Sequence, residues 1–91
     1  MSVAIYFSPA ALSEDQYNQS LQRLEADGSF PADGMLHHSC FGEPDHLMVY
    51  EVWESQEKLD AFGARLMPIL QELGIDPGQP SVMAVVNLQQ Q

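Results

Sequence analysis

The sequence has few positive charges. Its 91 residues include three lysines and arginines against thirteen aspartates and glutamates, which gives a formal net charge of −10. Nucleic-acid binding needs a basic surface to neutralise phosphates, and anionic membranes attract basic segments. The composition therefore argues against both kinds of partner, and the excess of acid favours solubility.

Cysteine and long apolar runs are also scarce. Cys40 is the one cysteine, so the chain forms no internal disulfide, and we expect a reducing, cytoplasmic location. No run approaches the roughly 20 apolar residues of a membrane span. The chain has no phosphate-binding glycine motif and no paired zinc-type ligands, so we expect no cofactor and no metal.

The apolar pattern predicts a single α+β domain over residues 1–91, with the element order β-α-β-β-α-β. Short apolar runs bounded by proline or glycine predict strands, and a spacing of three and four residues predicts helices. The predicted strands are Val3–Phe7, Met35–Phe41, His46–Trp53 and Val82–Leu88, and the middle two form a hairpin around a turn at 42–45.

The first helix is predicted from the residues at its ends. Ser13 and Gln16 fit a capping box, and Leu12 and Tyr17 occupy the positions of a hydrophobic staple. Gly28 can end the helix in a left-handed conformation.

The second helix is predicted from an N-cap at Ser55 to a C-terminal Gly74, with an apolar stripe between them. Pro68 lacks an N–H, so we expect a kink or a break there. The glutamines at 89–91 are predicted to fray.

Three of the predicted strands are apolar on both faces, over residues 5–7, 47–50 and 82–86. A strand of this kind is buried on both sides. Two helices on one face of an antiparallel sheet cover one side, so we expect a second sheet to cover the other. A homodimer with its sheets face to face is the simplest arrangement.

The run Tyr50-Glu51-Val52-Trp53-Glu54-Ser55, followed by Leu59 and Phe62, resembles the strand-to-helix junction of the dimeric α+β barrel superfamily. The similarity is greatest to its antibiotic-biosynthesis-monooxygenase-like branch. The resemblance implies a ferredoxin-like fold and a dimeric barrel. The superfamily includes cofactor-free monooxygenases, haem-degrading enzymes, isomerases, cyclases and proteins with no assigned reaction. Residues 56–73 contain no histidine, which argues against the haem-degrading activity.

His37 and His38 are the first candidates for chemistry. They are adjacent in a strand, so they point to opposite faces and only one can line a cavity beneath the helices. A turn at 42–45 predicts His37 opposite Tyr50 and His38 opposite Val49. One of the two histidines is a candidate general base, and the alternative is that both are structural.

Glu51 is a carboxylate in an otherwise apolar strand, and a buried carboxylate must be paired, hydrogen-bonded or protonated. A pair with His38 is one interpretation. A contact at the dimer interface, with Arg23 or Arg65 of either subunit, is the alternative that the sequence slightly favours.

Aromatic residues complete the candidate site. Tyr6 and Tyr50 each offer a hydroxyl that could orient a ligand, and Tyr50 is also a catalytic candidate. The resemblance makes Trp53 a candidate wall of the cavity, and Phe62 a candidate ligand contact. We expect a small homodimeric enzyme of cofactor-free monooxygenase type that acts on a small apolar or aromatic molecule. The alternative is a non-catalytic dimer that binds a ligand or serves a structural role.

Overall fold

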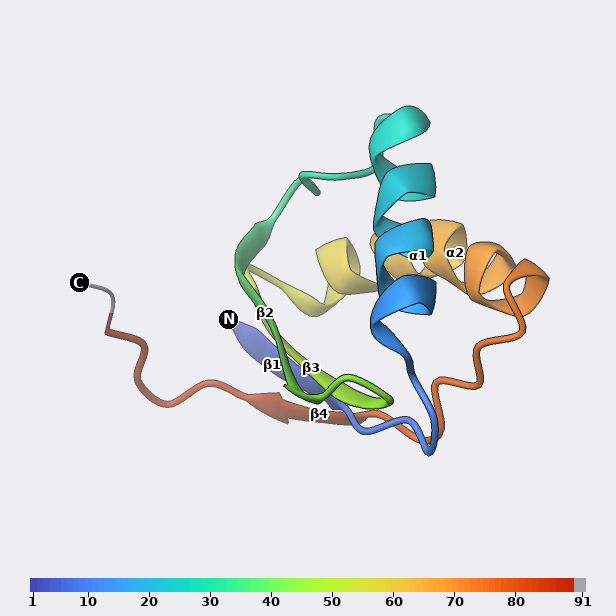
Figure 1. Ribbon diagram of the computed structural model, residues 1–91. Coiled ribbons are helices and arrows are strands. Elements are labelled where there is room, and N and C mark those ends of the chain that lie inside the picture. The colour runs from blue at the N-terminus through green and yellow to red at the C-terminus, as the bar shows by residue number, and fades with distance from the viewer. Residues whose placement is uncertain (90–91) are drawn as a thin grey trace.

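The computed structural model describes residues 1–89, in which two helices pack against one face of a four-stranded antiparallel sheet (Figure 1). The elements are β1 (Val3–Phe7), α1 (Glu14–Ala26), β2 (Met35–Glu43), β3 (His46–Trp53), α2 (Gln56–Glu72) and β4 (Ser81–Ala84). The strand order β2-β3-β1-β4 is that of a ferredoxin-like fold, which confirms the predicted α+β class and element order. In the described part of the chain no helix is long and apolar enough to cross a membrane. Gln90 and Gln91, which were predicted to fray, lie outside the described residues.

The predicted caps of α1 are confirmed. The Ser13 side chain accepts a bond from the Gln16 backbone N–H, and the Gln16 side chain accepts one from the Ser13 backbone N–H. Leu12 is buried in the same cluster that Tyr17 packs against, as a hydrophobic staple requires. Gly28 ends the helix with a φ of 80°. These contacts fix the direction in which α1 crosses the sheet, and therefore the place of Tyr17 above it.

Of the two outcomes predicted at Pro68, the break is wrong, because α2 continues through Pro68 to Glu72. A kink at this position stays a prediction. Proline removes one intrahelical hydrogen bond, but apolar packing on both sides of it stabilises the helix. Leu66 and Ile69 pack against the core, and Leu70 is buried. Gly74, with a φ of 69°, ends the helix as predicted.

The hairpin between β2 and β3 is longer than predicted. Its strands pair as far as Glu43 and His46, so the turn has two residues between the strands instead of four. Gly42 has a φ of 117°, and an added Cβ there would lie 2.7 Å from the His46 carbonyl oxygen, so the position requires glycine. The pairing is consequently moved by two residues: His38 lies opposite Glu51 instead of Val49, and His37 opposite Val52 instead of Tyr50. A shift of two residues preserves the faces of the sheet.

The start of β2 carries an irregularity that the sequence did not predict. The register shifts between Met35 and His37, as in a β-bulge with Leu36 as the extra residue. Met35 therefore packs against the Trp53 cluster beneath the helices, whereas Leu36 is exposed. The bulge places both Met35 and His38 on the face that the helices cover.

The last strand is shorter than predicted, because β4 ends at Ala84 instead of Leu88. Ala84 pairs with Val3, the first residue of β1, so the neighbouring strand ends there. One further backbone bond joins the Val85 N–H to the Ser2 carbonyl, and Val86 is fully exposed.

The face of the sheet away from the helices is open (Figure 1). Because side chains alternate along a strand, this face carries Tyr6, Phe41, Met48, Tyr50 and Met83. Phe41 is 44% exposed, Tyr50 37% and Met83 61%. The fold therefore leaves an apolar surface in water on the side opposite the cavity.

Candidate functional site

Four polar side chains form a continuous chain of hydrogen bonds between α1 and the sheet. The Tyr17 hydroxyl lies 2.6 Å from His38 Nε2, and His38 Nδ1 lies 2.8 Å from Glu51 Oε2. Trp53 Nε1 donates to Glu51 Oε1 over 3.0 Å. Glu51 and Trp53 are buried. These hydrogen bonds join residues that lie up to 36 positions apart in the sequence, so only the folded sheet and its first helix bring them together.

The local structure positions each of these four hydrogen-bonded side chains. His38 and Glu51 are directly paired across β2 and β3, and Glu51 and Trp53 share a face because they are two residues apart in a strand. The Tyr17 ring stacks on the His38 ring with centroids 6.0 Å apart and planes 16° from parallel. Phe30 meets the His38 ring edge-on at 5.5 Å. Aromatic contacts on two sides thus hold the imidazole in place.

The directions of the hydrogen bonds follow from the groups involved. An ionised carboxylate only accepts hydrogen bonds, so Glu51 takes them from the Trp53 indole N–H and from His38 Nδ1–H. In neutral His38, Nε2 is then an acceptor and takes the Tyr17 O–H. Glu51 thereby holds the histidine in the tautomer whose basic nitrogen points to α1.

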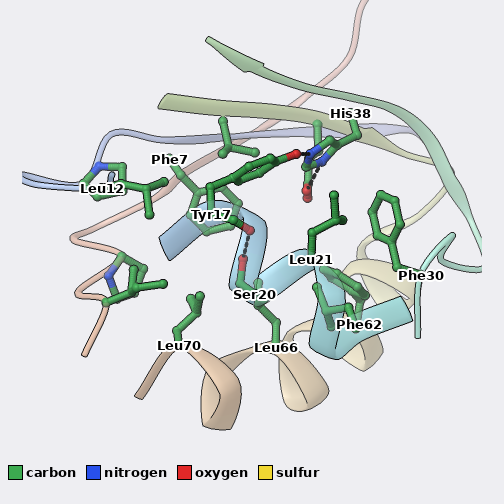
Figure 2. Close-up of a pocket in the computed structure, with 16 residues that line it drawn as sticks. Phe7, Leu12, Tyr17, Ser20, Leu21, Phe30, His38, Phe62, Leu66 and Leu70 are labelled. Atoms are coloured by element: carbon green, nitrogen blue, oxygen red, sulfur yellow. Dashed lines mark hydrogen bonds and ion pairs between the residues drawn. The ribbon is translucent and has the colours of Figure 1, made fainter. Parts of the chain in front are cut away.

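A cavity of about 70 Å³ lies along these hydrogen-bonded side chains, between the helices and the sheet (Figure 2). Its polar wall consists of Tyr17, Ser20, His38 and Glu51. The Ser20 hydroxyl donates to the Tyr17 carbonyl at 2.7 Å. The rest of the wall is mainly apolar and includes Phe7, Leu12, Leu21, Leu24, Phe62 and Leu66.

Burial changes the acid–base properties of two groups near the cavity. Loss of solvent, followed by the negative charges that Cys40 and Glu51 can carry, raises the pKa of Tyr17 from 10.0 to about 12. Burial, followed by repulsion from Glu14, raises the pKa of the Cys40 thiol. Tyr17 is thus a neutral hydroxyl at physiological pH, and the Cys40 thiol ionises less readily than a free thiol.

The structure separates the predicted site residues into two groups. His38, Glu51 and Phe62 line the cavity. Trp53 lies behind them, completely buried, with its ring 5.1 Å from that of Phe62. The remaining three candidates, His37, Tyr50 and Tyr6, lie on the open face of the sheet.

On the open face these three make other contacts. The His37 and Tyr50 rings lie 5.8 Å apart, and the Tyr6 hydroxyl donates to Met48 Sδ at 2.9 Å. None of them lines the cavity described above. Of the two adjacent histidines, His38 is therefore the one that faces the helices.

Glu51 is paired as the first interpretation of the sequence expected. Its partners are His38 and Trp53, whereas Arg23 pairs with Glu72 and Arg65 donates to the Ser29 hydroxyl. The alternative that the sequence slightly favoured, a contact of Glu51 with either arginine, does not occur within the chain.

Tyr17 is the candidate site residue that the sequence reasoning missed, because it was counted only as an apolar member of the hydrophobic staple. A signal was present: Tyr17 carries a hydroxyl, whereas Leu21 and Leu24, which follow it at helical spacing, do not. A tyrosine on the buried face of a helix needs a hydrogen-bond partner in the core.

Among residues 1–89 the structure contains no group of three or more histidine, cysteine, aspartate or glutamate side chains that could hold a metal ion. The polar side chains of the cavity wall, Tyr17, His38 and Glu51, can transfer protons and form hydrogen bonds.

No protein-family model and no curated protein matches the chain. Several solved structures have a similar fold. A "putative antibiotic biosynthesis monooxygenase" from Chloroflexus aurantiacus is 17% identical, with 99% of this chain and 98% of that chain covered and a TM-score of 0.64. SnoaB, a cofactor-independent oxygenase from Streptomyces nogalater, is 12% identical over 96% of this chain and 93% of its own, with a TM-score of 0.63. The chain has the antibiotic-biosynthesis-monooxygenase-like fold. The resemblance noted at the strand-to-helix junction is thus confirmed at the level of the fold.

A protein of unknown function from Nitrosomonas europaea has the same fold, at 12% identity over 99% of this chain and 94% of its own, with a TM-score of 0.63. Proteins with this fold therefore include some whose function is not known, and the fold does not decide the activity.

Proposed function

We propose that the protein is a homodimeric, cofactor-free enzyme of monooxygenase type that acts on a small aromatic hydroxyl compound. The observation that carries the proposal is the His38–Glu51 pair, at 2.8 Å, in the wall of a mainly apolar cavity. A neutral imidazole held by a carboxylate is suited to accept a proton near neutral pH. An apolar enclosure suits an aromatic ring.

The chemistry begins with loss of the ligand's hydroxyl proton to His38. The imidazolium that forms is stabilised by Glu51, which remains ionised beside it. The ring of the resulting phenolate is electron-rich and can reduce dioxygen directly. One oxygen atom enters the ring and the other leaves as water, so that a phenol and dioxygen give a quinone and water. No metal is needed for this balance.

The size of the cavity restricts the ligand. About 70 Å³ is well below the roughly 300–1,000 Å³ of sites for drug-sized ligands. A single-ring compound is the size class that requires the least movement of the wall. The printed name of SnoaB, a cofactor-independent oxygenase, agrees with this reaction type, but it describes that protein.

The open face of the sheet supports a homodimer. Phe41, Tyr50 and Met83 are exposed on this face and are apolar or aromatic. The face also carries exposed His37 and, at the hairpin end of β2, exposed Glu43. A second copy can cover the apolar part of this face and leave Glu43 at its edge. Each cavity lies on the helix side of its own sheet, so the dimer proposal and the cavity proposal can be tested separately. A reducing, cytoplasmic location stays a prediction from the free Cys40.

Dioxygen uptake in the presence of phenol, 1-naphthol or hydroquinone tests the proposed activity. We expect the wild-type protein to accelerate uptake above the spontaneous rate and His38→Gln to lose the acceleration. His37→Gln is the matched control, because His37 lies on the opposite face. Equal rates in both variants would refute a role for His38, and no uptake with any of the three compounds would refute the proposed activity on such compounds.

A non-catalytic ligand-binding or structural dimer is the second candidate. It is favoured by the fact that, among the described residues, no buried side-chain nitrogen or oxygen lacks a hydrogen-bond partner. A polar network that satisfies itself can exist for stability alone. Native mass spectrometry of freshly purified protein separates the candidates further, because a reproducible extra mass on the dimer identifies a ligand that a purely structural dimer would lack.

A further inference from the structure

We infer that Tyr17 is the residue that contacts the ligand's hydroxyl group and that it passes the proton to His38. The relay rests on the proposed function, because it gives the path by which that site would accept a proton. It assigns the first contact with the ligand to Tyr17 of α1 instead of to the histidine.

The inference follows from the hydrogen-bonding capacity of the groups in the cavity wall. Both nitrogens of His38 are engaged, one by Tyr17 and the other by Glu51. A neutral imidazole has one donor and one acceptor, so His38 has no capacity left for a ligand. A ligand could reach His38 directly only after displacing Tyr17.

Tyr17 has the capacity that His38 lacks. Its O–H donates to His38 Nε2 at 2.6 Å, and a phenolic oxygen can accept a further hydrogen bond while it donates one. Tyr17 and His38 both line the cavity, and Figure 2 shows the Tyr17 hydroxyl joined to the imidazole along its wall. A ligand hydroxyl that donates to Tyr17 would thereby be joined to the histidine through one oxygen atom.

The relay is balanced in protons and charge. The bond from the ligand's oxygen to its hydrogen breaks as that hydrogen binds the Tyr17 oxygen. At the same time the Tyr17 hydrogen moves to His38 Nε2. The products are a ligand oxyanion, an unchanged neutral tyrosine and an imidazolium whose charge is balanced by Glu51. No electron changes hands in this step.

The environment of Tyr17 fits a relay better than a stored tyrosinate. Burial raises the pKa of Tyr17 to about 12, so the residue does not hold a negative charge between reactions. Glu51, which also contributes to that shift, is the group that stabilises a positive charge on His38. The two residues thus favour a state in which the proton ends on the histidine and the tyrosine is neutral.

The test uses 4-nitrophenol, whose ionised form absorbs visible light and whose neutral form does not. At a pH below the probe's own pKa, we expect wild-type protein to bind the probe and to increase its ionised fraction. In Tyr17→Phe the ratio of ionised to neutral bound probe should fall about tenfold, which corresponds to loss of one hydrogen bond to a charged group. Tyr6→Phe is the matched control, because it removes a hydroxyl on the opposite face that contacts Met48.

The outcomes separate the relay from the proposed function. Binding and ionisation that are unchanged in Tyr17→Phe would overturn the relay and leave the proposed function intact. A wild-type protein that binds no probe would count against the proposed function, and the relay would then be judged without ligand. In that case ¹⁵N NMR of the His38 ring decides: Tyr17→Phe should shift the Nε2 resonance and leave Nδ1 protonated. An unmoved Nε2 resonance would overturn the relay.

Discussion

His38 and Glu51 are paired directly across β2 and β3, and their side chains meet at 2.8 Å on the face that the helices cover. Glu51 is further held by the Trp53 indole, so the carboxylate is fixed from two sides. This arrangement makes the orientation and the tautomer of the histidine depend on one carboxylate.

Glu51→Gln tests this dependence. The amide keeps the size of the side chain but can donate to His38 Nδ1, which would move the imidazole proton to Nε2. We expect the tautomer of His38 to invert and the free energy of unfolding to fall by about 1–3 kcal/mol, the cost of a disturbed buried hydrogen bond. ¹⁵N NMR and urea unfolding measure the two effects. Glu25→Gln, at an exposed position of α1, is the control and should change stability by about 0.5 kcal/mol or less.

The sequence predicted the helices and the element order well because these depend on local signals. The capping box at Ser13 and the glycines after both helices act within a few residues of where they stand. Of the kink or break expected at Pro68, the break does not occur, because tertiary packing of α2 outweighs the loss of one hydrogen bond.

The site was harder to predict because it depends on pairing between distant segments. A turn of two residues instead of four moved Glu51 from a diagonal neighbour of His38 to its direct partner. The sequence also cannot show which face of a strand meets the helices, so His37 and His38 were equivalent candidates. Tyr17 was missed because its partner becomes known only when α1 is placed over β2.

Tyr17→Phe should change how stability depends on pH. The ordinary pKa of tyrosine is 10.0 and the folded value for Tyr17 is about 12. Between these values the unfolded chain has lost the proton and the folded protein keeps it. The contribution of Tyr17 to the free energy of unfolding is therefore complete below pH 10 and is lost as the pH rises through about 12. We expect this part of the alkaline loss of stability to be absent in Tyr17→Phe, as measured by urea unfolding at several pH values.

The same variant has a second expected effect at neutral pH. Removal of the hydroxyl leaves His38 Nε2 without its partner, which should lower the free energy of unfolding by about 1 kcal/mol. Tyr6→Phe is the control for both effects. A wild-type and Tyr17→Phe pair with parallel stability curves up to pH 12 would contradict the burial of this hydroxyl.

Tyr50→Glu tests the proposed dimer. Tyr50 lies near the middle of the open face, so a glutamate there would meet its own symmetry mate or apolar side chains across the interface. We expect the dissociation constant of the dimer to rise by more than about tenfold, or 1.4 kcal/mol, in sedimentation experiments. Met67→Glu places the same charge at an exposed apolar position of α2 and should leave the dimer unchanged. A wild-type protein that sediments as a monomer would rule out the dimer.

Leu21→Ala should widen the range of ligands that the cavity accepts. Leu21 lies one helical turn after Tyr17 and lines the cavity (Figure 2). Its half-buried side chain can be shortened at a cost of about 1–3 kcal/mol of stability, and the space gained adds to the cavity that Tyr17 also lines. We expect affinity for the two-ring 1-naphthol to increase relative to phenol by about 1 kcal/mol, roughly the burial of one further methylene group. Isothermal titration with both compounds measures the change.

Met67→Ala is the control for this prediction. It shortens an exposed side chain of α2 and should preserve the wild-type preference between the two compounds. The same preference in Leu21→Ala as in the wild type would show that ligands do not occupy this cavity.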